Sequence, residues 1–245
     1  MNTQLESLLE LGEVLLENNG TGHHILFLSV IGEIEGHHLS SDRIKTTKYE
    51  HLLPLLTQVQ DNQEIDGLFL LINTVGGDCS CGLAAAEMIA SIKKPTVSLV
   101  IGDSHSIGVP LSVAADRTFI APTATMILHP VRLNGTIIGA PQTFEYFRLI
   151  QDRIVTFVEA HTGVAKSRLE RMMIRQGMMV KDLGTILVGK MAVEEGIIDE
   201  VGGVSEALFW LHQEIERSRK KRQEWSKASA LHLPRKREYV YASRK

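Results

Sequence analysis

Ser106 has the clearest setting for covalent chemistry. It lies in the run Gly-Asp-Ser-His-Ser-Ile-Gly at residues 102–108, between a predicted buried strand and a predicted helix. Backbone N–H groups at the start of a helix lack partners within it, and they can hold the negative oxygen that forms when a nucleophile attacks an acyl carbon. Taken alone, a serine in such a turn is more often a helix cap. Ser106 is therefore a candidate nucleophile that requires a base.

His129 is the candidate base. It follows a predicted strand and precedes Pro130. Histidine titrates near neutral pH, so it can take a proton from a serine hydroxyl and later give it to a leaving amine. His105 is a rival, but neighbours on a turn or helix point in different directions, so His105 is poorly placed to reach the Ser106 hydroxyl.

A glycine pair, Gly76-Gly77, directly follows another predicted strand. Glycines let the backbone approach another chain closely and can leave an N–H group pointing outward. Taken alone, such a pair is more often a simple tight turn.

The elements that must position these residues alternate between strands and helices, which predicts an α/β layered domain. Strands are expected at residues 24–31, 68–72, 96–101, 117–120 and 125–129. Helices are expected at residues 5–16, 48–60, 82–91, 141–161, 165–175 and 204–224, with another helix directly after a turn at residues 103–105. Residues 185–200 are expected to form a strand, a short helix and a strand.

The composition predicts a globular cytoplasmic protein. Apolar residues make up 44% of the chain, but no apolar stretch approaches the roughly 20 residues of a membrane span, and the acidic N-terminus is unlike a secretory signal. Cys79 and Cys81 are too close in sequence for an unstrained bridge, so we expect free thiols. With no metal-ligand spacing between the cysteines and the histidines, we expect no metal ion. We also expect no organic cofactor.

Charge is distributed unevenly along the chain. Residues 217–245 hold eleven Lys or Arg and two Glu, whereas residues 1–216 hold 15 basic and 27 acidic side chains. We expect an N-terminal amphipathic helix or arm at residues 1–22, a folded domain at residues 23–216 and a basic, mobile tail at residues 217–245. The tail contains Trp225, Tyr239 and Tyr241. We expect either a solvated tail or contact with an anionic membrane, and no specific nucleic-acid binding.

Taken together, these segments resemble the Clp protease proteolytic subunit family from about residue 25 to residue 201. The matching segments are, in order, Phe27-Leu28 with Gly32-Glu33-Ile34; Leu71-Ile72-Asn73-x-x-Gly76-Gly77-x4-Gly82; Gly102-x-x-x-Ser106-Ile107-Gly108; Met126-Ile127-Leu128-His129-Pro130; His161-Thr162-Gly163; and Ala192-Val193-Glu194-x-Gly196-Ile197-Ile198-Asp199.

The resemblance implies a serine endopeptidase with Ser106 as nucleophile, His129 as general base, and the backbone N–H groups of Gly77 and Ile107 as the oxyanion hole. It also implies a Clp-protease/crotonase-like fold of repeated β-β-α units, in which the helix at residues 141–161 is a handle between two rings of subunits. The family usually receives unfolded substrate from an ATP-driven unfoldase.

The chain departs from the family pattern at the third catalytic residue. The position of the family's aspartate falls on Gly184, and Asp182 is the nearest replacement. The segment between Ser106 and His129 is also shorter by about two residues, and the basic tail is foreign to the family. The chain looks most like a divergent branch, the Clp-protease-like translocation-enhancing proteins, which are linked to preprotein export and to degradation of signal peptides.

Two other functions remain open. Loss of the aspartate permits a catalytically silent relative that acts as a scaffold with other subunits or with the export machinery. Acyl-CoA hydratases and isomerases share the fold class and a glycine-rich oxyanion loop, but they do not need the Ser106 and His129 pair.

Overall fold

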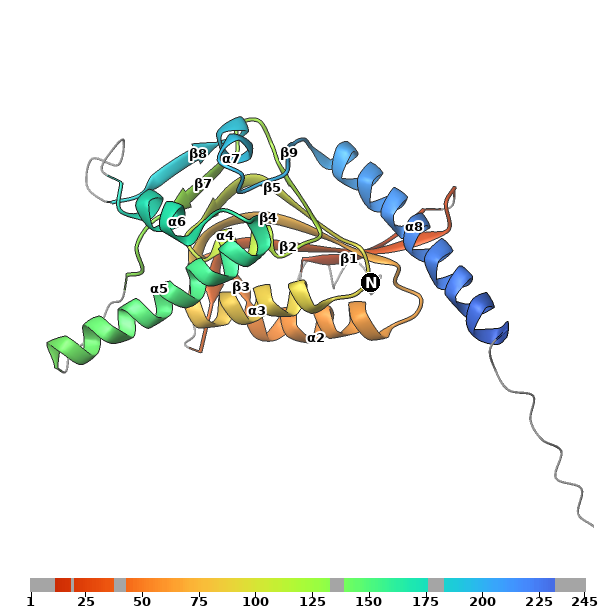
Figure 1. Cartoon of the computed structure of the whole chain (residues 1–245), viewed down its shortest axis with the longest axis horizontal. Coiled ribbons are helices and arrows are strands. Elements are labelled where there is room, and N and C mark those ends of the chain that lie inside the picture. Colours follow the sequence, from red (N-terminus) through yellow and green to blue (C-terminus); the bar gives the residue numbers. More distant parts are fainter. Residues whose placement is uncertain (1–11, 19, 38–42, 133–138, 176–182, 232–245) are drawn as a thin grey trace, which may run out of the picture.

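The computed structural model describes residues 12–18, 20–37, 43–132, 139–175 and 183–231 (Figure 1). These ranges contain one nine-stranded sheet and seven helices. The strands are β1 (Glu13–Asn18), β2 (His23–Glu35), β3 (Thr46–Lys48), β4 (Gly67–Gly77), β5 (Thr96–His105), β6 (Arg117–Ile120), β7 (Thr125–Leu128), β8 (Thr185–Val188) and β9 (Glu200–Val201). The helices are α2 (Tyr49–Asp61), α3 (Cys79–Ser91), α4 (Gly108–Val113), α5 (Ala140–Thr162), α6 (Lys166–Met173), α7 (Lys190–Glu194) and α8 (Val204–Leu231).

The sheet is mostly parallel, in the order β1-β2-β4-β5-β6-β9, with β3 beside β2 and β7 between β5 and β8. Only the β1–β2 and β7–β8 pairs within it are antiparallel. Parallel strands covered by helices on both faces are apolar along their whole length, which is why residues 68–72 form a continuous apolar run. The α/β fold class predicted from the sequence is confirmed.

Two cores lie on opposite faces of the sheet, because successive strand side chains point to opposite sides. On β4, Leu68 and Leu70 face the larger core, which contains side chains of α2 to α6, whereas Phe69 faces the smaller one. The smaller core is formed by Ile25, Phe69, Val97, Leu99 and Phe119 with three residues of α8, namely Ala207, Leu211 and Ile215. Helix α8 therefore covers a face of the sheet that the other helices leave open.

The prediction of a helix at residues 5–16 is wrong for residues 12–16, the part of that range that the structure describes. Glu13–Asn18 forms the strand β1, which pairs with β2 from Glu13 opposite Leu28 to Asn18 opposite His23. The hairpin is closed by Asn18, whose carbonyl accepts the Gly22 N–H at 2.7 Å. Pairing along the edge of the sheet outweighs the leucine spacing that favoured a helix. Residues 1–11 lie outside the described residues.

Two other expectations also need correction. Residues 103–105 are not a turn but the end of β5, because they pair with Thr125, Met126 and Ile127 of β7. The boundary at residue 217 does not end the folded part, because α8 continues to Leu231. This segment is rich in Arg, Lys, Gln, Glu and Ala, which favour helices. The rest of the expected mobile tail, residues 232–245, lies outside the described residues.

Among the described helices, none combines the length and the apolar character that crossing a membrane requires.

Candidate active site

Ser106 occupies a strained turn between β5 and α4. Its φ is 57°, and it is the one non-glycine residue with a positive φ in the described part of the chain. Left-handed backbone is costly for a residue with a side chain, and such residues concentrate at functional sites. The Ser106 N–H donates to the Ile127 carbonyl at 2.9 Å, which fastens the turn to β7. The fold therefore maintains this strain at the predicted nucleophile.

Gly76 makes room for the serine turn. A Cβ at this position would lie 2.8 Å from the Ser106 Cβ and 2.9 Å from the His105 carbonyl oxygen, and φ is +96°. Only glycine allows the end of β4 to come so close. Glycine is required at position 77 by a different contact, because a Cβ added there would lie 2.3 Å from the Ile34 carbonyl oxygen of β2. Gly76 thus lets β4 approach the serine turn closely, and Gly77 lets the same strand approach β2.

The predicted oxyanion donors lie on either side of this turn. Gly77 is the last residue of β4, and Ile107 directly precedes the first turn of α4. Backbone N–H groups at such a helix start point away from the helix. Their action as an oxyanion hole stays a prediction.

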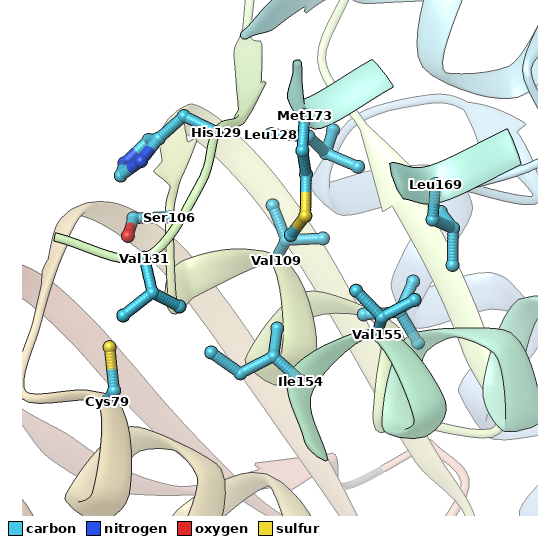
Figure 2. A pocket seen from close by; sticks show the side chains of 11 residues that line it. Cys79, Ser106, Val109, Leu128, His129, Val131, Ile154, Val155, Leu169 and Met173 are labelled. Atoms are coloured by element: carbon cyan, nitrogen blue, oxygen red, sulfur yellow. The ribbon is translucent and has the colours of Figure 1, made fainter. Parts of the chain in front are cut away.

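The fold brings His129 to the same pocket as Ser106. The hydrogen bond from Ser106 to Ile127 fixes the turn two residues before His129, and both side chains line one hollow. Figure 2 shows the imidazole ring close to the serine hydroxyl. No hydrogen bond between the two side chains occurs among the described contacts, so proton transfer requires the ring to approach the hydroxyl.

The imidazole of His129 is oriented by a backbone carbonyl. Its Nδ1 lies 2.7 Å from the Pro130 carbonyl oxygen. Because a carbonyl only accepts, this contact assigns the proton to Nδ1 and leaves the lone pair of the neutral ring on Nε2. Nε2 binds no other described residue. This is the tautomer that a general base for serine needs.

Gly184 lies beside His129, at the position where the resemblance to the family places the aspartate. Antiparallel pairing puts Thr185 opposite Leu128, so Gly184 comes next to His129. A Cβ on Gly184 would lie 3.1 Å from the His129 Cβ and 2.7 Å from the Leu128 carbonyl oxygen. The backbone therefore leaves no room for a side chain there. Asp182, the predicted replacement, lies outside the described residues and stays a prediction.

His105 is held away from Ser106, as expected. Its Nε2 lies 2.8 Å from Thr125 Oγ1 and 3.3 Å from Asp103 Oδ1, and Thr125 Oγ1 donates to Asp103 at 2.7 Å. Burial lowers the pKa of His105; Asp103 opposes this shift and His129 adds to it. Sequence reasoning missed the roles of Asp103 and Thr125, because only the pairing of β5 with β7 puts them opposite each other.

An apolar pocket extends from Ser106 between β7, α5 and α6. The structure leaves about 20 Å³ of accessible space in it, close to the room of one water molecule. Its walls are Val109, Leu128, Val131, Ile154, Val155, Val158, Leu169 and Met173, and Cys79, Ser106 and His129 also line it (Figure 2). Its apolar lining suits an uncharged side chain of a substrate beside the serine, which would enter as the walls move apart.

The two cysteines are free thiols. Burial first, and then the charge of Asp78, raise the pKa of Cys79. The thiol is therefore protonated and is a weak rival to Ser106 as a nucleophile. In the described ranges, no three His, Cys, Asp or Glu side chains are grouped to hold a metal ion.

Comparison with known proteins agrees with this geometry. Residues 35–205 match the family model described as Clp protease. The chain is 50% identical to the translocation-enhancing protein TepA of Halalkalibacterium halodurans over 190 residues, which cover 78% of this chain and 74% of the relative.

Two more distant similarities were found. The chain is 25% identical to a putative signal peptide peptidase SppA of Enterococcus faecium over an alignment of 241 residues. This alignment covers 84% of this chain and 67% of the relative. It is 32% identical to the ATP-dependent Clp protease proteolytic subunit of Streptococcus uberis over 91 residues, or 36% of this chain and 45% of the relative.

Proposed function

The chain belongs to the Clp protease family, and from that premise we propose that it is a serine endopeptidase. The observation that carries the proposal is the strained Ser106 in one pocket with His129, whose Nδ1 is bound to the Pro130 carbonyl. Strain at the nucleophile and a correctly protonated base both serve serine catalysis, and neither is needed for a structural turn.

The reaction begins when His129 Nε2 takes the proton of the Ser106 hydroxyl as its oxygen attacks the peptide carbonyl. The N–H groups of Gly77 and Ile107 hold the oxyanion that forms. His129 then gives the proton to the leaving amine, the C–N bond breaks, and an acyl ester remains on Ser106. A water molecule, deprotonated by His129, attacks this ester and releases the carboxylic acid product.

The pocket beside Ser106 favours peptides with an apolar side chain next to the cleaved bond. Its walls carry no charged side chain, so an aspartate or lysine placed there would lose its hydration without gaining a partner. Unfolded polypeptides expose such apolar residues, and so do signal peptides. The names of the TepA and SppA relatives support a substrate connected with preprotein export.

Assembly is the second part of the proposal. Clp proteases usually form rings and work with unfoldases, and we propose a homo-oligomeric ring in the cytoplasm, supplied by an unfoldase or by the export machinery. Helix α5 presents exposed Phe144, Tyr146 and Leu149, with 65%, 54% and 58% of their surface accessible. Apolar residues gathered on one protruding helix support contact with another subunit.

Peptide hydrolysis tests the proposal. The assembled protein is incubated with fluorogenic peptides that carry either leucine or aspartate before the cleaved bond. We expect cleavage after leucine, and we expect Ser106→Ala to reduce it at least about a thousandfold. Ser91→Ala, a change of an exposed serine on α3, is the matched control. Hydrolysis that persists in Ser106→Ala would contradict the proposal.

A silent scaffold is the second candidate, and Gly184 is the observation that favours it. No side chain from this position can fix the imidazole of His129. A scaffold would assemble normally and cleave no peptide, so sedimentation of the same sample used for the assay distinguishes it from an unassembled peptidase.

A further inference from the structure

The first half of α8 is fixed to the body of the protein. Ala207, Leu211 and Ile215 are fully buried against the sheet. These residues recur every four positions, so one stripe of the helix faces the smaller core. The direction of the whole helix is therefore set by its packed first half.

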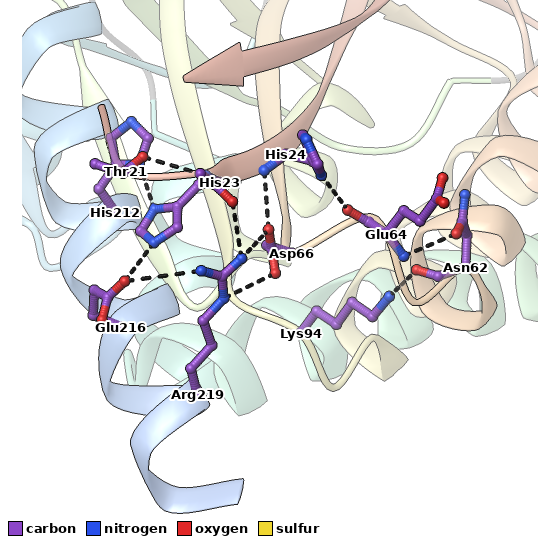
Figure 3. Close-up of polar contacts among 11 residues, drawn as sticks. Thr21, His23, His24, Asn62, Glu64, Asp66, Lys94, His212, Glu216 and Arg219 are labelled. Carbon is purple, nitrogen blue, oxygen red and sulfur yellow. Dashed lines mark hydrogen bonds and ion pairs between the residues drawn. The ribbon is translucent and has the colours of Figure 1, made fainter. Parts of the chain in front are cut away.

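A polar clamp extends this attachment to Arg219 (Figure 3). The Arg219 guanidinium donates to both carboxylate oxygens of Asp66, at 3.2 and 2.7 Å, and to the Gly22 carbonyl at 3.1 Å. His23 is completely buried; its Nε2 lies 2.7 Å from Glu216 and its Nδ1 lies 2.8 Å from His212. The clamp joins α8 to the start of β2 and β4.

Beyond Arg219 the helix leaves the body. All residues from 220 to 225 are exposed, and Figure 1 shows the end of α8 extending away from the sheet. This segment, the α8 tip, contains three cations, Lys220, Lys221 and Arg222, against one carboxylate, Glu224, and ends at Trp225. Among the described residues, no carboxylate forms an ion pair with these three cations.

We infer that the α8 tip binds an anionic lipid surface. Lys221 and Arg222 lie four and three residues before Trp225, so on a helix they flank the indole. Trp225 is 75% exposed, although burial of an indole is strongly favourable. Cations beside an exposed tryptophan suit the headgroup layer of an anionic membrane, where the charges meet phosphates and the ring reaches the acyl boundary.

The charge of the body determines how the protein would approach such a surface. Residues 1–216 carry 27 acidic and 15 basic side chains, so an anionic bilayer repels them, whereas residues 217–245 carry eleven basic side chains and two acidic ones. Only the α8 end is attracted. The clamp at Arg219 keeps this end directed away from the body. Binding would therefore hold the enzyme at the membrane without laying the body flat on it.

Vesicle sedimentation with the full chain tests this inference. One set of vesicles contains phosphatidylcholine alone, and the other contains about 30% phosphatidylglycerol, which gives an anionic surface. We expect binding to the anionic vesicles only, weakened by added salt because surface charges are screened. The triple variant Lys220→Gln, Lys221→Gln, Arg222→Gln should bind about a hundredfold more weakly, and Trp225→Ala severalfold more weakly.

The matched control removes three exposed cations elsewhere, through Arg148→Gln, Arg153→Gln and Lys190→Gln, and should bind like the wild type. The inference is overturned if the α8 triple variant binds as well as the wild type, or if neutral vesicles are bound equally. It is also overturned if the full chain does not sediment with vesicles of either kind, even if the tip binds a DNA oligonucleotide or a second copy of the chain. Because these residues lie outside the serine pocket, peptide hydrolysis in the triple variant tests the peptidase proposal separately.

Discussion

The two ends of the parallel strands use histidine in different ways. At the amino end of β2, His23 is fully buried and both of its ring nitrogens have partners, His212 and Glu216. At the carboxyl ends of β5 and β7, His129 lines a pocket and uses only Nδ1, bound to a backbone carbonyl. A histidine with both nitrogens occupied fastens two elements together, whereas one with a free nitrogen can transfer a proton.

Removing the free Nε2 of His129 should have the largest effect on peptide hydrolysis. We expect His129→Gln to lower peptide hydrolysis about 10²–10⁴-fold, because general-base assistance contributes that much. His105→Gln should have a much smaller effect, since His105 Nε2 is already bound to Thr125. Steady-state hydrolysis by both variants gives the comparison, and a larger loss in His105→Gln would show that the wrong histidine has been assigned as base.

Crowding the serine turn should have the next largest effect. In Gly76→Ala the new methyl group meets Ser106 Cβ at 2.8 Å, and a displacement of about 1 Å at a reacting group can cost about a hundredfold in rate. Gly163→Ala is the matched control, because Gly163 also has a positive φ, +72°, but nothing lies within 4 Å of the place that its methyl group would occupy. Equal activity in the two alanine variants would mean that the close approach of Gly76 is unimportant.

The Arg219 clamp, at the amino ends of β2 and β4, should affect the stability of the fold and not peptide hydrolysis. We expect Arg219→Gln to lower the free energy of unfolding by about 1.5–3 kcal/mol, because Asp66, which is largely buried, loses charged hydrogen bonds. Arg217→Gln removes only an exposed contact with Glu214 and should cost about 0.2–1 kcal/mol. Urea unfolding measures both, and a reversed order would rule out the clamp.

Lowering the pH should also weaken the attachment of α8, by less than Arg219→Gln does. Burial, and then His23, lower the pKa of His212 from its ordinary 6.5, and the hydrogen bond from His23 is the main cause that lowers the pKa of Glu216 from 4.5. In both cases the unfolded state binds protons more readily, so the stabilisation is present at higher pH and is lost as pH falls, first below about 6.5 for His212.

Amide hydrogen exchange at about pH 7.5 and pH 5.5, corrected for the intrinsic rates, should therefore show protection falling in α8 more than in α2. His212→Gln should reduce this difference. Equal loss of protection in both helices would show that His212 and Glu216 do not control the attachment of α8.

The sequence predicted most of the parallel core, because buried strands and amphipathic helices leave strong local patterns. The continuous run at residues 68–72 became part of β4, and the helix expected at residues 48–60 became α2. The resemblance to the Clp protease family identified Ser106 and His129, which the structure brings to one pocket. Both residues directly follow strands, where local sequence and family pattern agree.

What the sequence did not reveal depends on pairing between distant segments. Strand β1 forms because residues 13–18 pair with β2, although their leucines favour a helix. The contact of His129 with the Pro130 carbonyl is a matter of ring orientation, which no residue pattern encodes. The buried His23 and His212 pair joins residues 189 positions apart, and only the packed position of α8 brings them together.

Activation of Ser106 for attack underlies the proposed peptidase. It is tested most directly by labelling the assembled protein with a fluorophosphonate probe, followed by mass spectrometry to locate the adduct. We predict an adduct on Ser106 that disappears in Ser106→Ala and forms far more slowly in His129→Gln. A folded, assembled sample that gives no adduct on Ser106 would contradict this activation and would favour the silent scaffold.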